Sequence, residues 1–230
     1  MLLVFHATVV SWYLYTIWYD QQYVEIKFPA KEFEHVPFKA RAIFFTFWSM
    51  ILQTLYFIVA TLNDVIGSNA TTERPPFIRR LKDILFTLTL TTAFYVVLVF
   101  WTFYTIDKTM IIPDKEAEDQ IPKWINHTLH TTILPVMLIE LLITKRNYPS
   151  RKMGFSIAMW VIAIYGTYIH VVYFKYGIWP YPFMYVASWG LKILHFVCST
   201  ILGLSFYVLG EKLDSLVSGK IKFGRIKYVD

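Results

Sequence analysis

The sequence predicts an all-α fold: a polytopic membrane protein built as a bundle of six transmembrane helices. Composition is the first observation behind this prediction. Of the 230 residues, 56% are hydrophobic and only 17% are charged, whereas a soluble domain carries roughly 25% charged residues. Aromatic residues make up 19% of the chain, and tryptophan and tyrosine are enriched at membrane interfaces. The chain has too few charges to cover a water-facing surface, so we expect it to lie largely in lipid.

The second observation is a set of six apolar runs, each long enough to cross a bilayer. A helix needs about 20 residues to span roughly 30 Å of hydrocarbon. The runs cover residues 2–19, 41–62, 83–106, 122–144, 153–174 and 184–209. None of the loops between them is long or apolar enough to form a second core. The chain is therefore predicted to be a single domain, residues 1–230.

Each run can be justified in turn from its boundaries. The first lacks the basic segment and the cleavage site of a signal peptide and contains Trp12 and Trp18, so we expect it to be a retained anchor. The later runs begin at or next to charged or proline-containing segments, in order Arg41, Lys82-Asp83, Pro122-Lys123, Arg151-Lys152 and Trp179-Pro180-Tyr181-Pro182. Such segments belong at the membrane surface.

Charges in the loops predict the orientation and the partners. With the N-terminus inside, thirteen Lys and Arg residues lie on the inner side and eight on the outer side, and short loops rich in these residues stay cytoplasmic. Both termini are therefore predicted to be cytoplasmic, in the endoplasmic reticulum or the plasma membrane. The basic residues are dispersed, so we expect membrane lipids and no nucleic acid as partners. Cys198 is the single cysteine and excludes a disulfide framework. The sequence carries no signal for the oligomeric state.

Polar side chains inside the spans predict a functional site, because lipid penalises them and they normally face the interior of a bundle. The second span carries one such set at positions i, i+3 and i+7, which share one face of a helix: Thr46, Ser49 and Gln53. Two histidines open the fourth span about one turn apart: His127 and His130. The sixth span carries a stripe with spacing four, three and four: Ser188, Lys192, His195 and Ser199. We expect an intramembrane polar cavity where these faces meet.

The depth of these residues places the cavity in the outer half of the bundle. Thr46 lies five residues past Arg41, and His130 lies seven past Lys123. With a rise of ~1.5 Å per residue, both are expected roughly 8 to 11 Å below the outer interface. His195 enters from the same side and is expected somewhat deeper. Thr46 and His130 are therefore predicted to meet.

A threonine and a histidine at one depth can perform acyl transfer. A hydroxyl is a weak nucleophile until a base takes its proton, and imidazole titrates near neutral pH. Thr46 would attack an ester with His130 as its base, and the acyl-threonine would then be hydrolysed. Candidates for orienting the imidazole or stabilising the oxyanion are Asn126, His127 and His195. This chemistry needs no cofactor and no metal.

Two alternatives stay open at this point. His127, His130 and His195 with a carboxylate would suit zinc and an activated water, as in a zinc-dependent membrane lipid hydrolase or amidase. Two histidines at i and i+3 without an intervening glutamate are a weak zinc signal. A non-enzymatic lipid-binding or transport protein would instead use the polar stripes for helix packing. The repeated halves typical of many transporters are not evident.

Short motifs spread along most of the chain resemble those of a known family. The most specific is Trp124-x-Asn126-His127-x-x-His130-Thr131. The others include Phe45-Thr46-Phe47 with Gln53, Leu62-Asn63-Asp64-Val65, Leu134-Pro135 with Glu140, Tyr148-Pro149-Ser150 and Leu209-Gly210-Glu211-Lys212-Leu213. Together they resemble the FAR-17a family, which contains the androgen-induced gene 1 and androgen-dependent TFPI-regulating proteins.

The resemblance implies an activity and two site residues. It implies an intramembrane threonine hydrolase that cleaves fatty acid esters of hydroxy fatty acids into a fatty acid and a hydroxy fatty acid. By position, the nucleophile falls on Thr46 and the catalytic histidine on His130. An ester of two long chains partitions strongly into lipid, so we expect the lipid ester substrate to enter from the bilayer.

Overall fold

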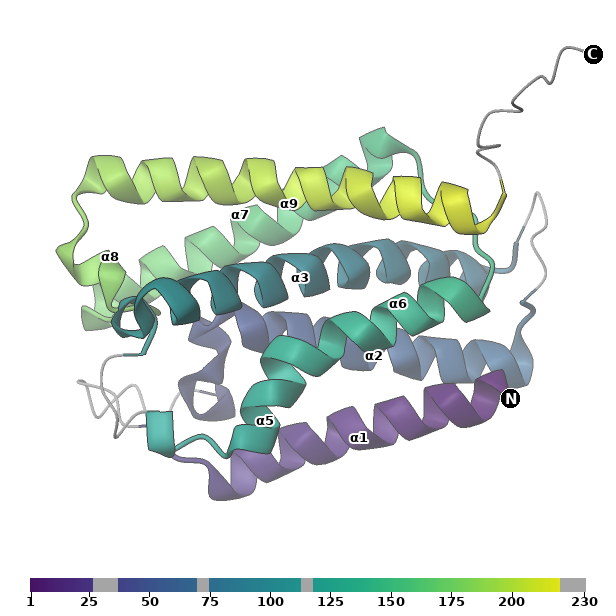
Figure 1. The fold of residues 1–230 in the computed structure, drawn as a ribbon, viewed down its shortest axis with the longest axis horizontal. Coiled ribbons are helices and arrows are strands. Elements are labelled where there is room, and N and C mark those ends of the chain that lie inside the picture. Colours follow the sequence, from purple (N-terminus) through teal and green to yellow (C-terminus); the bar gives the residue numbers. More distant parts are fainter. Residues whose placement is uncertain (27–36, 70–74, 113–117, 220–230) are drawn as a thin grey trace, which may run out of the picture.

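The computed structural model describes residues 1–26, 37–69, 75–112 and 118–219, and the regular elements in that part of the chain are all helices. Five are long and apolar enough to cross a membrane. They are α1 (Leu2–Tyr23), α2 (Phe45–Ile66), α3 (Phe77–Asp107), α7 (Arg151–Tyr176) and α9 (Trp189–Val217). Figure 1 shows them running lengthwise along the molecule. The predicted class, an all-α polytopic membrane protein, is confirmed.

The fourth predicted span, 122–144, is helical but not regular. It consists of α5 (Lys123–His127), the π-helical segment η4 (Thr128–Thr132) and α6 (Ile133–Ile143), which follow one another without a break. Pro135 explains the wider turn, because it has no N–H to donate and its ring crowds the carbonyl four residues earlier. In Figure 1, α5 and α6 cross the front of the bundle obliquely between α1 and α3.

The sixth predicted span begins later than expected. Residues 183–186 form the short helix α8 (Phe183–Val186), and α9 begins only at Trp189. The Ser188 side chain accepts a hydrogen bond from the N–H of Leu191 at 3.3 Å, which is the usual way a serine caps a helix. Two short 3₁₀ segments complete the fold, η2 (Pro37–Ile43) before α2 and η3 (Lys108–Met110) after α3. The assignment of the chain to a single domain stays a prediction.

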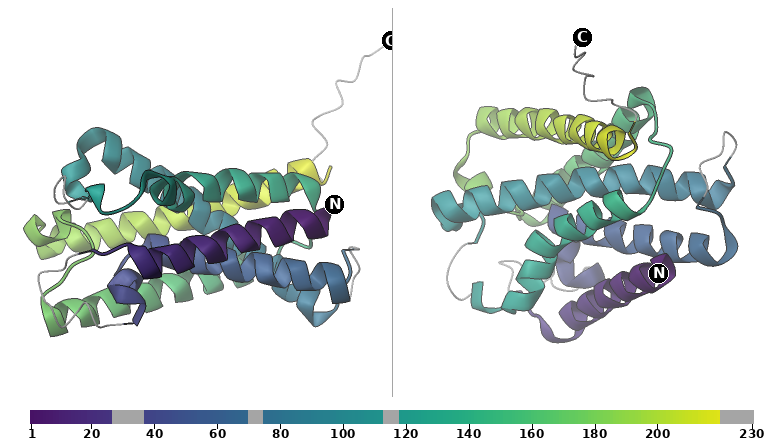
Figure 2. Two further views of the ribbon diagram at one scale, coloured as in Figure 1. Left: turned by 90° about the horizontal axis from the view of Figure 1, so that it is seen from below. Right: turned by 45° about the vertical axis from the view of Figure 1, so that its right-hand side comes forward.

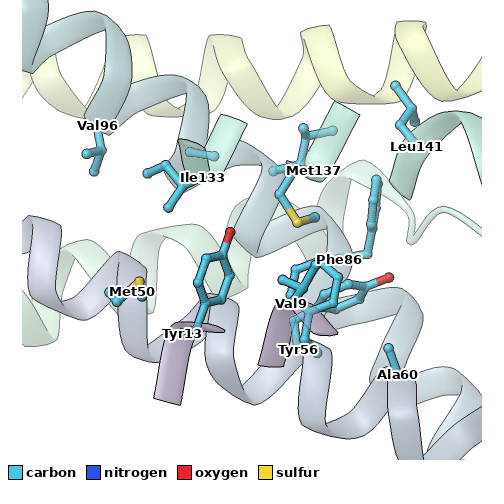
Figure 3. Close-up of a cluster of buried hydrophobic side chains, with 13 residues drawn as sticks. Val9, Tyr13, Met50, Tyr56, Ala60, Phe86, Val96, Ile133, Met137 and Leu141 are labelled. Atoms are coloured by element: carbon cyan, nitrogen blue, oxygen red, sulfur yellow. The ribbon is translucent and has the colours of Figure 1, made fainter. Parts of the chain in front are cut away.

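A buried hydrophobic cluster joins α1, α2, α3 and α6 between mid-bundle and the end where α1 begins. Its members include Tyr13, Tyr56, Phe86 and Met137, all at most 1% exposed. Figure 3 shows these side chains meeting between the helices. Between helices that lie in lipid, such a cluster stabilises the bundle through close van der Waals packing. The cluster fixes the helices on one side of the cavity described below.

A buried ionic network lies at the end of the bundle where α1 begins and α9 ends. The side chain of Glu140 is fully buried; its Oε1 accepts a hydrogen bond from Tyr56 at 2.5 Å, and its Oε2 lies 2.9 Å from Nε2 of His6. Nδ1 of His6 lies 2.6 Å from Oδ2 of Asp64, and Nζ of Lys82 lies 3.8 Å from Glu140. Removing charges from water is costly unless they are paired and hydrogen-bonded. The network ties α1 to α2, α3 and α6, and Figure 2 shows these helices from two further sides.

Candidate active site

A cavity of about 580 Å³ lies in the half of the bundle nearest α8. Its wall is formed by α1, α2, α3, α5, η4, α7 and α9 together with the segments before α2 and α9, and it is largely apolar. Four of the five candidate site residues line it, namely Thr46, Asn126, His130 and His195, and so does Ser199 of the polar stripe in the sixth span. The expected polar cavity is thus an apolar one in which a few polar groups gather. Such a lining suits long acyl chains around a small reactive centre.

Thr46 is the second residue of α2, and its position is fixed by the turn before that helix. The indole of Trp48 donates to the carbonyl of Ala42 at 2.7 Å, and the hydroxyl of Tyr165 donates to the carbonyl of Ile43 at 2.9 Å. Thr46 is half-buried, and its hydroxyl has no hydrogen-bond partner in the part of the chain that the structure describes. The first N–H groups of a helix lack intrahelical acceptors and carry the positive end of the helix dipole. Thr46 therefore combines an available hydroxyl with a helix N-terminus.

His130 is held in one orientation and one tautomer. Its Nδ1 lies 2.7 Å from the side-chain oxygen of Asn126 and 3.0 Å from the backbone carbonyl of the same residue. A carbonyl oxygen can only accept, so Nδ1 carries the proton and Nε2 carries the lone pair. The imidazole ring also stacks on Phe100, with centroids 3.6 Å apart and planes 15° apart. The unprotonated Nε2 is the form that a general base requires.

The π-helical segment explains how His130 reaches the cavity. In a π turn the carbonyl of residue i accepts a hydrogen bond from the N–H of residue i+5. The residue five positions after His130 is Pro135, which has no N–H to donate. The indole of Trp101 on α3 supplies the missing donor at 2.9 Å from the carbonyl of His130 and lies 3.2 Å from Oγ1 of Thr131. Insertions of this kind are frequent at functional sites. Proline and indole together stabilise an irregular turn at the predicted catalytic histidine.

The structure does not bring His127 to the cavity. Its ring is exposed and stacks against Trp101, with centroids 5.8 Å apart, and Nδ1 lies 3.2 Å from the hydroxyl of Thr131. The π turn begins directly after His127 and rotates it away from His130. His127 is therefore not placed to orient the base or to stabilise an oxyanion in the cavity.

His195 does reach the cavity, from α9. It is half-buried and packs edge-on against Phe183 at 5.0 Å between centroids. No hydrogen bond joins it to His130 in the described part of the chain. Tyr181, on the segment between α7 and α8, also lines the cavity, and burial raises its pKa to about 12. The phenol of Tyr181 stays neutral at physiological pH and can donate a hydrogen bond.

The zinc alternative does not fit this geometry. It requires His127, His130 and His195 to converge with a carboxylate, yet His127 faces away from the cavity that the other two line. Among residues 1–26, 37–69, 75–112 and 118–219, no group of three or more His, Cys, Asp or Glu residues is arranged to hold a metal ion. The arrangement instead offers a hydroxyl, a neutral imidazole and a helix N-terminus around an apolar space.

Sequence reasoning missed a charged pair in the cavity wall. Arg41 and its partner Asp20 both line the cavity and are buried. In the sequence, Arg41 marks only the outer interface at the start of the second apolar run. The signal that could have found the pair is an aspartate near the end of the first apolar run facing an arginine at the start of the second. Neither charge is expected inside a span unless it has a partner.

Fold and site together define a class: a helical membrane protein with a threonine and a histidine at one intramembrane cavity. Comparison with known proteins identifies the family. The family model described as FAR-17a/AIG1-like protein matches residues 1–215, and the chain belongs to this family. The motif resemblance is thereby confirmed.

Individual relatives agree with this assignment. The chain is 34% identical over 217 residues to the androgen-dependent TFPI-regulating protein of Rattus norvegicus, covering 91% of this chain and 90% of the relative. It is 31% identical over 226 residues to the protein of that name from Homo sapiens, covering 97% and 96%. It is also 32% identical over 182 residues to the androgen-induced gene 1 protein of Homo sapiens, covering 76% of each chain. No solved structure matches the chain.

Proposed function

We propose that this protein is an intramembrane threonine hydrolase that cleaves fatty acid esters of hydroxy fatty acids into a fatty acid and a hydroxy fatty acid. The observation that carries the proposal is that Thr46 and His130, from α2 and η4, line the same largely apolar cavity. These elements pack directly against each other. Family membership and the fixed tautomer of His130 support the same reaction.

The proposed reaction has two steps. The hydroxyl of Thr46 attacks the ester carbonyl while Nε2 of His130 takes its proton. The tetrahedral intermediate then releases the hydroxy fatty acid, whose alkoxide oxygen receives that proton, and an acyl-threonine remains. In the second step His130 activates a water that attacks the acyl group, which releases the fatty acid and restores Thr46. Because Asn126 holds the proton of the imidazole on Nδ1, Nε2 is free to work in both steps.

Negative charge on the ester oxygen needs donors near the start of α2. The backbone N–H of Thr46 lies in the first turn of that helix and has no hydrogen-bond acceptor within the described residues. A nucleophile's own N–H serves in this way in serine proteases, and the helix dipole adds to it. The side-chain amide N–H of Asn126 and the ring of His195 are further candidate donors at the cavity wall.

The substrate is proposed to come from the bilayer. Each buried CH₂ group favours lipid over water by about 0.8 kcal/mol, so an ester with two long chains resides almost entirely in the membrane. The reaction needs no cofactor, and membrane lipids surround the protein. We further propose that both termini lie in the cytoplasm and that the protein resides in the endoplasmic reticulum or the plasma membrane, as the loop charges predict.

Hydrolysis of a branched fatty acid ester by protein purified in detergent tests this proposal. Thr46→Ala and His130→Ala are each expected to lower kcat by at least about 1,000-fold, because each removes one member of a unit that acts together. A fluorophosphonate probe should label Thr46 in the wild type and not in Thr46→Ala. Thr61→Ala and His127→Ala are the matched controls, since neither residue lines the cavity, and both should retain activity.

The other outcomes discriminate between the alternatives. Full activity in Thr46→Ala at equal amounts of folded protein would eliminate the threonine mechanism. Loss of wild-type activity on treatment with a chelator, restored by zinc, would favour the metal-dependent hydrolase despite the separation of the histidines. No turnover in any form, with retained binding of a labelled ester, would favour a lipid-binding protein.

A further inference from the structure

Arg41 is a buried cation in the wall of the cavity that the hydrolytic reaction leaves unused. The whole residue is 4% exposed. Its Nε donates to both carboxylate oxygens of Asp20, at 3.0 and 3.2 Å, and its Nη2 donates to the backbone carbonyl of Val24 at 3.0 Å. These bonds orient the guanidinium and attach η2 to the end of α1.

The hydrogen-bonding capacity of Arg41 is not exhausted by these partners. Its Nη1 is buried and has no hydrogen-bond partner in the part of the chain that the structure describes. A guanidinium has five N–H donors in a planar fork, and two of them are on this nitrogen. Buried donors without an acceptor are rare in proteins, and each one calls for an explanation. At the wall of a ligand cavity, the simplest explanation is an acceptor that arrives with the ligand.

The missing acceptor must suit an arginine at this place. Arg41 lies five residues before Thr46, and both residues line the same cavity. Asp20 balances the charge of Arg41 in the absence of a ligand, and Nη1 still offers N–H donors that suit a carboxylate. The substrate class proposed above carries one free carboxylate, on its hydroxy-acid half, in addition to the ester.

We propose that Arg41 is a specificity-determining residue whose Nη1 binds the free carboxylate of the hydroxy-acid half while Thr46 attacks the ester. The inference rests on the proposed hydrolase function and deepens it. The contact between Arg41 and the carboxylate makes the enzyme selective for esters that carry a free acid. Neutral esters such as the corresponding methyl esters fill the apolar cavity without engaging Arg41.

The experiment compares one branched ester as its free acid and as its methyl ester, presented at equal mole fraction in mixed micelles. Wild-type protein should prefer the free acid, mainly through a lower KM. Arg41→Gln should reduce the ratio of kcat/KM values by roughly tenfold to a hundredfold, since a hydrogen bond to a charged group is lost. Turnover of the methyl ester should fall less than that of the free acid, because only the free acid offers a carboxylate to Nη1. Arg151→Gln is the matched control, because this arginine is exposed and pairs with Glu211 away from the cavity.

A merely structural role for Arg41 would affect both esters equally, so an unchanged ratio in folded Arg41→Gln would overturn the proposal. If that variant does not fold, Arg41→Lys takes its place, because lysine keeps the positive charge but lacks the planar N–H donors of the guanidinium. A ratio of kcat/KM values in Arg41→Lys equal to that of the wild type would then overturn the proposal. Lack of preference in the wild type itself would do the same.

A separate binding measurement distinguishes this inference from the hydrolase function. If the wild type hydrolyses neither ester, displacement of a fluorescent fatty acid by oleic acid and by methyl oleate still tests the carboxylate site. Tighter binding of oleic acid that disappears in Arg41→Gln or Arg41→Lys would support the site without the reaction. Equal displacement by the two ligands in the wild type would refute it.

Discussion

Replacing Glu140 by glutamine tests whether the buried ionic network holds the bundle together. Glu140 accepts hydrogen bonds from Tyr56 at 2.5 Å and Thr144 at 3.0 Å and lies 2.9 Å from Nε2 of His6, with its side chain fully buried. An amide of the same shape removes the negative charge and leaves Lys82, 3.8 Å away, without its ionic partner. Breaking a buried pair on one side costs about 3–5 kcal/mol.

That cost converts into a measurable melting temperature. For chains of 150–250 residues, 1 kcal/mol shifts the melting temperature by roughly 2–4 °C, so Glu140→Gln should melt roughly 6–20 °C below the wild type. Tryptophan fluorescence of detergent-purified protein during heating reports the transition. Glu211→Gln is the matched control. Oε2 of Glu211 lies 2.7 Å from Nε of Arg151, but the side chain of Arg151 is 59% exposed. Exposed pairs are worth about 0–1 kcal/mol, so this control should shift by less than about 4 °C.

The comparison of the two glutamine variants decides the argument. Equal shifts would mean that the buried network contributes no more than a surface ion pair. Its dense contacts would then be an arrangement of side chains without consequence for stability.

Three further substitutions, one in the site and two at glycines, probe the site and the helix packing. Asn126→Ala should lower kcat only about five- to tenfold, because Nδ1 of His130 keeps its bond to the backbone carbonyl. Steady-state kinetics measures this, and a loss above about 1,000-fold would show that the amide alone holds the imidazole. Gly154→Ala should destabilise the fold by about 1–3 kcal/mol in thermal unfolding, because a Cβ there overlaps the ring of Tyr207. Gly166→Ala has open space around it and should be neutral or stabilising; identical melting of the two glycine variants would contradict this packing argument.

The spans could be predicted from hydropathy because lipid demands long apolar helices, but hydropathy misplaced their ends. The third helix begins at Phe77 rather than at residue 83, because its first charges are buried and paired. Arg79 pairs with Asp83 of the same helix, and Lys82 pairs with Glu140 of α6. The last helix continues to Val217 rather than ending at 209. A hydropathy average treats a paired charge and a solvated charge alike, so it cannot locate a helix end that lies inside an ionic network.

The site was predictable only in part, for a related reason. The spacing of His127 and His130 puts both side chains near one face of a regular helix, since three residues turn it by roughly 300°. The π turn that Pro135 and Trp101 stabilise separates them. Its donor comes from another helix, so the local sequence does not reveal it. The role of Arg41 could not be predicted from the sequence, because its unpaired Nη1 is identified only once the partners of its other nitrogens are known.

The His6–Glu140 contact also constrains how the protein is made. The two residues are 134 positions apart, so the first helix has left the ribosome long before its partner exists. Arg146, which lies 3.3 Å from Asp214, meets its partner later in synthesis, because that partner belongs to the last helix, α9. The ionic end of the bundle therefore closes only after residue 214 has been made. A chain that stops before residue 214 therefore leaves Arg146 without this carboxylate partner at the ionic end of the bundle.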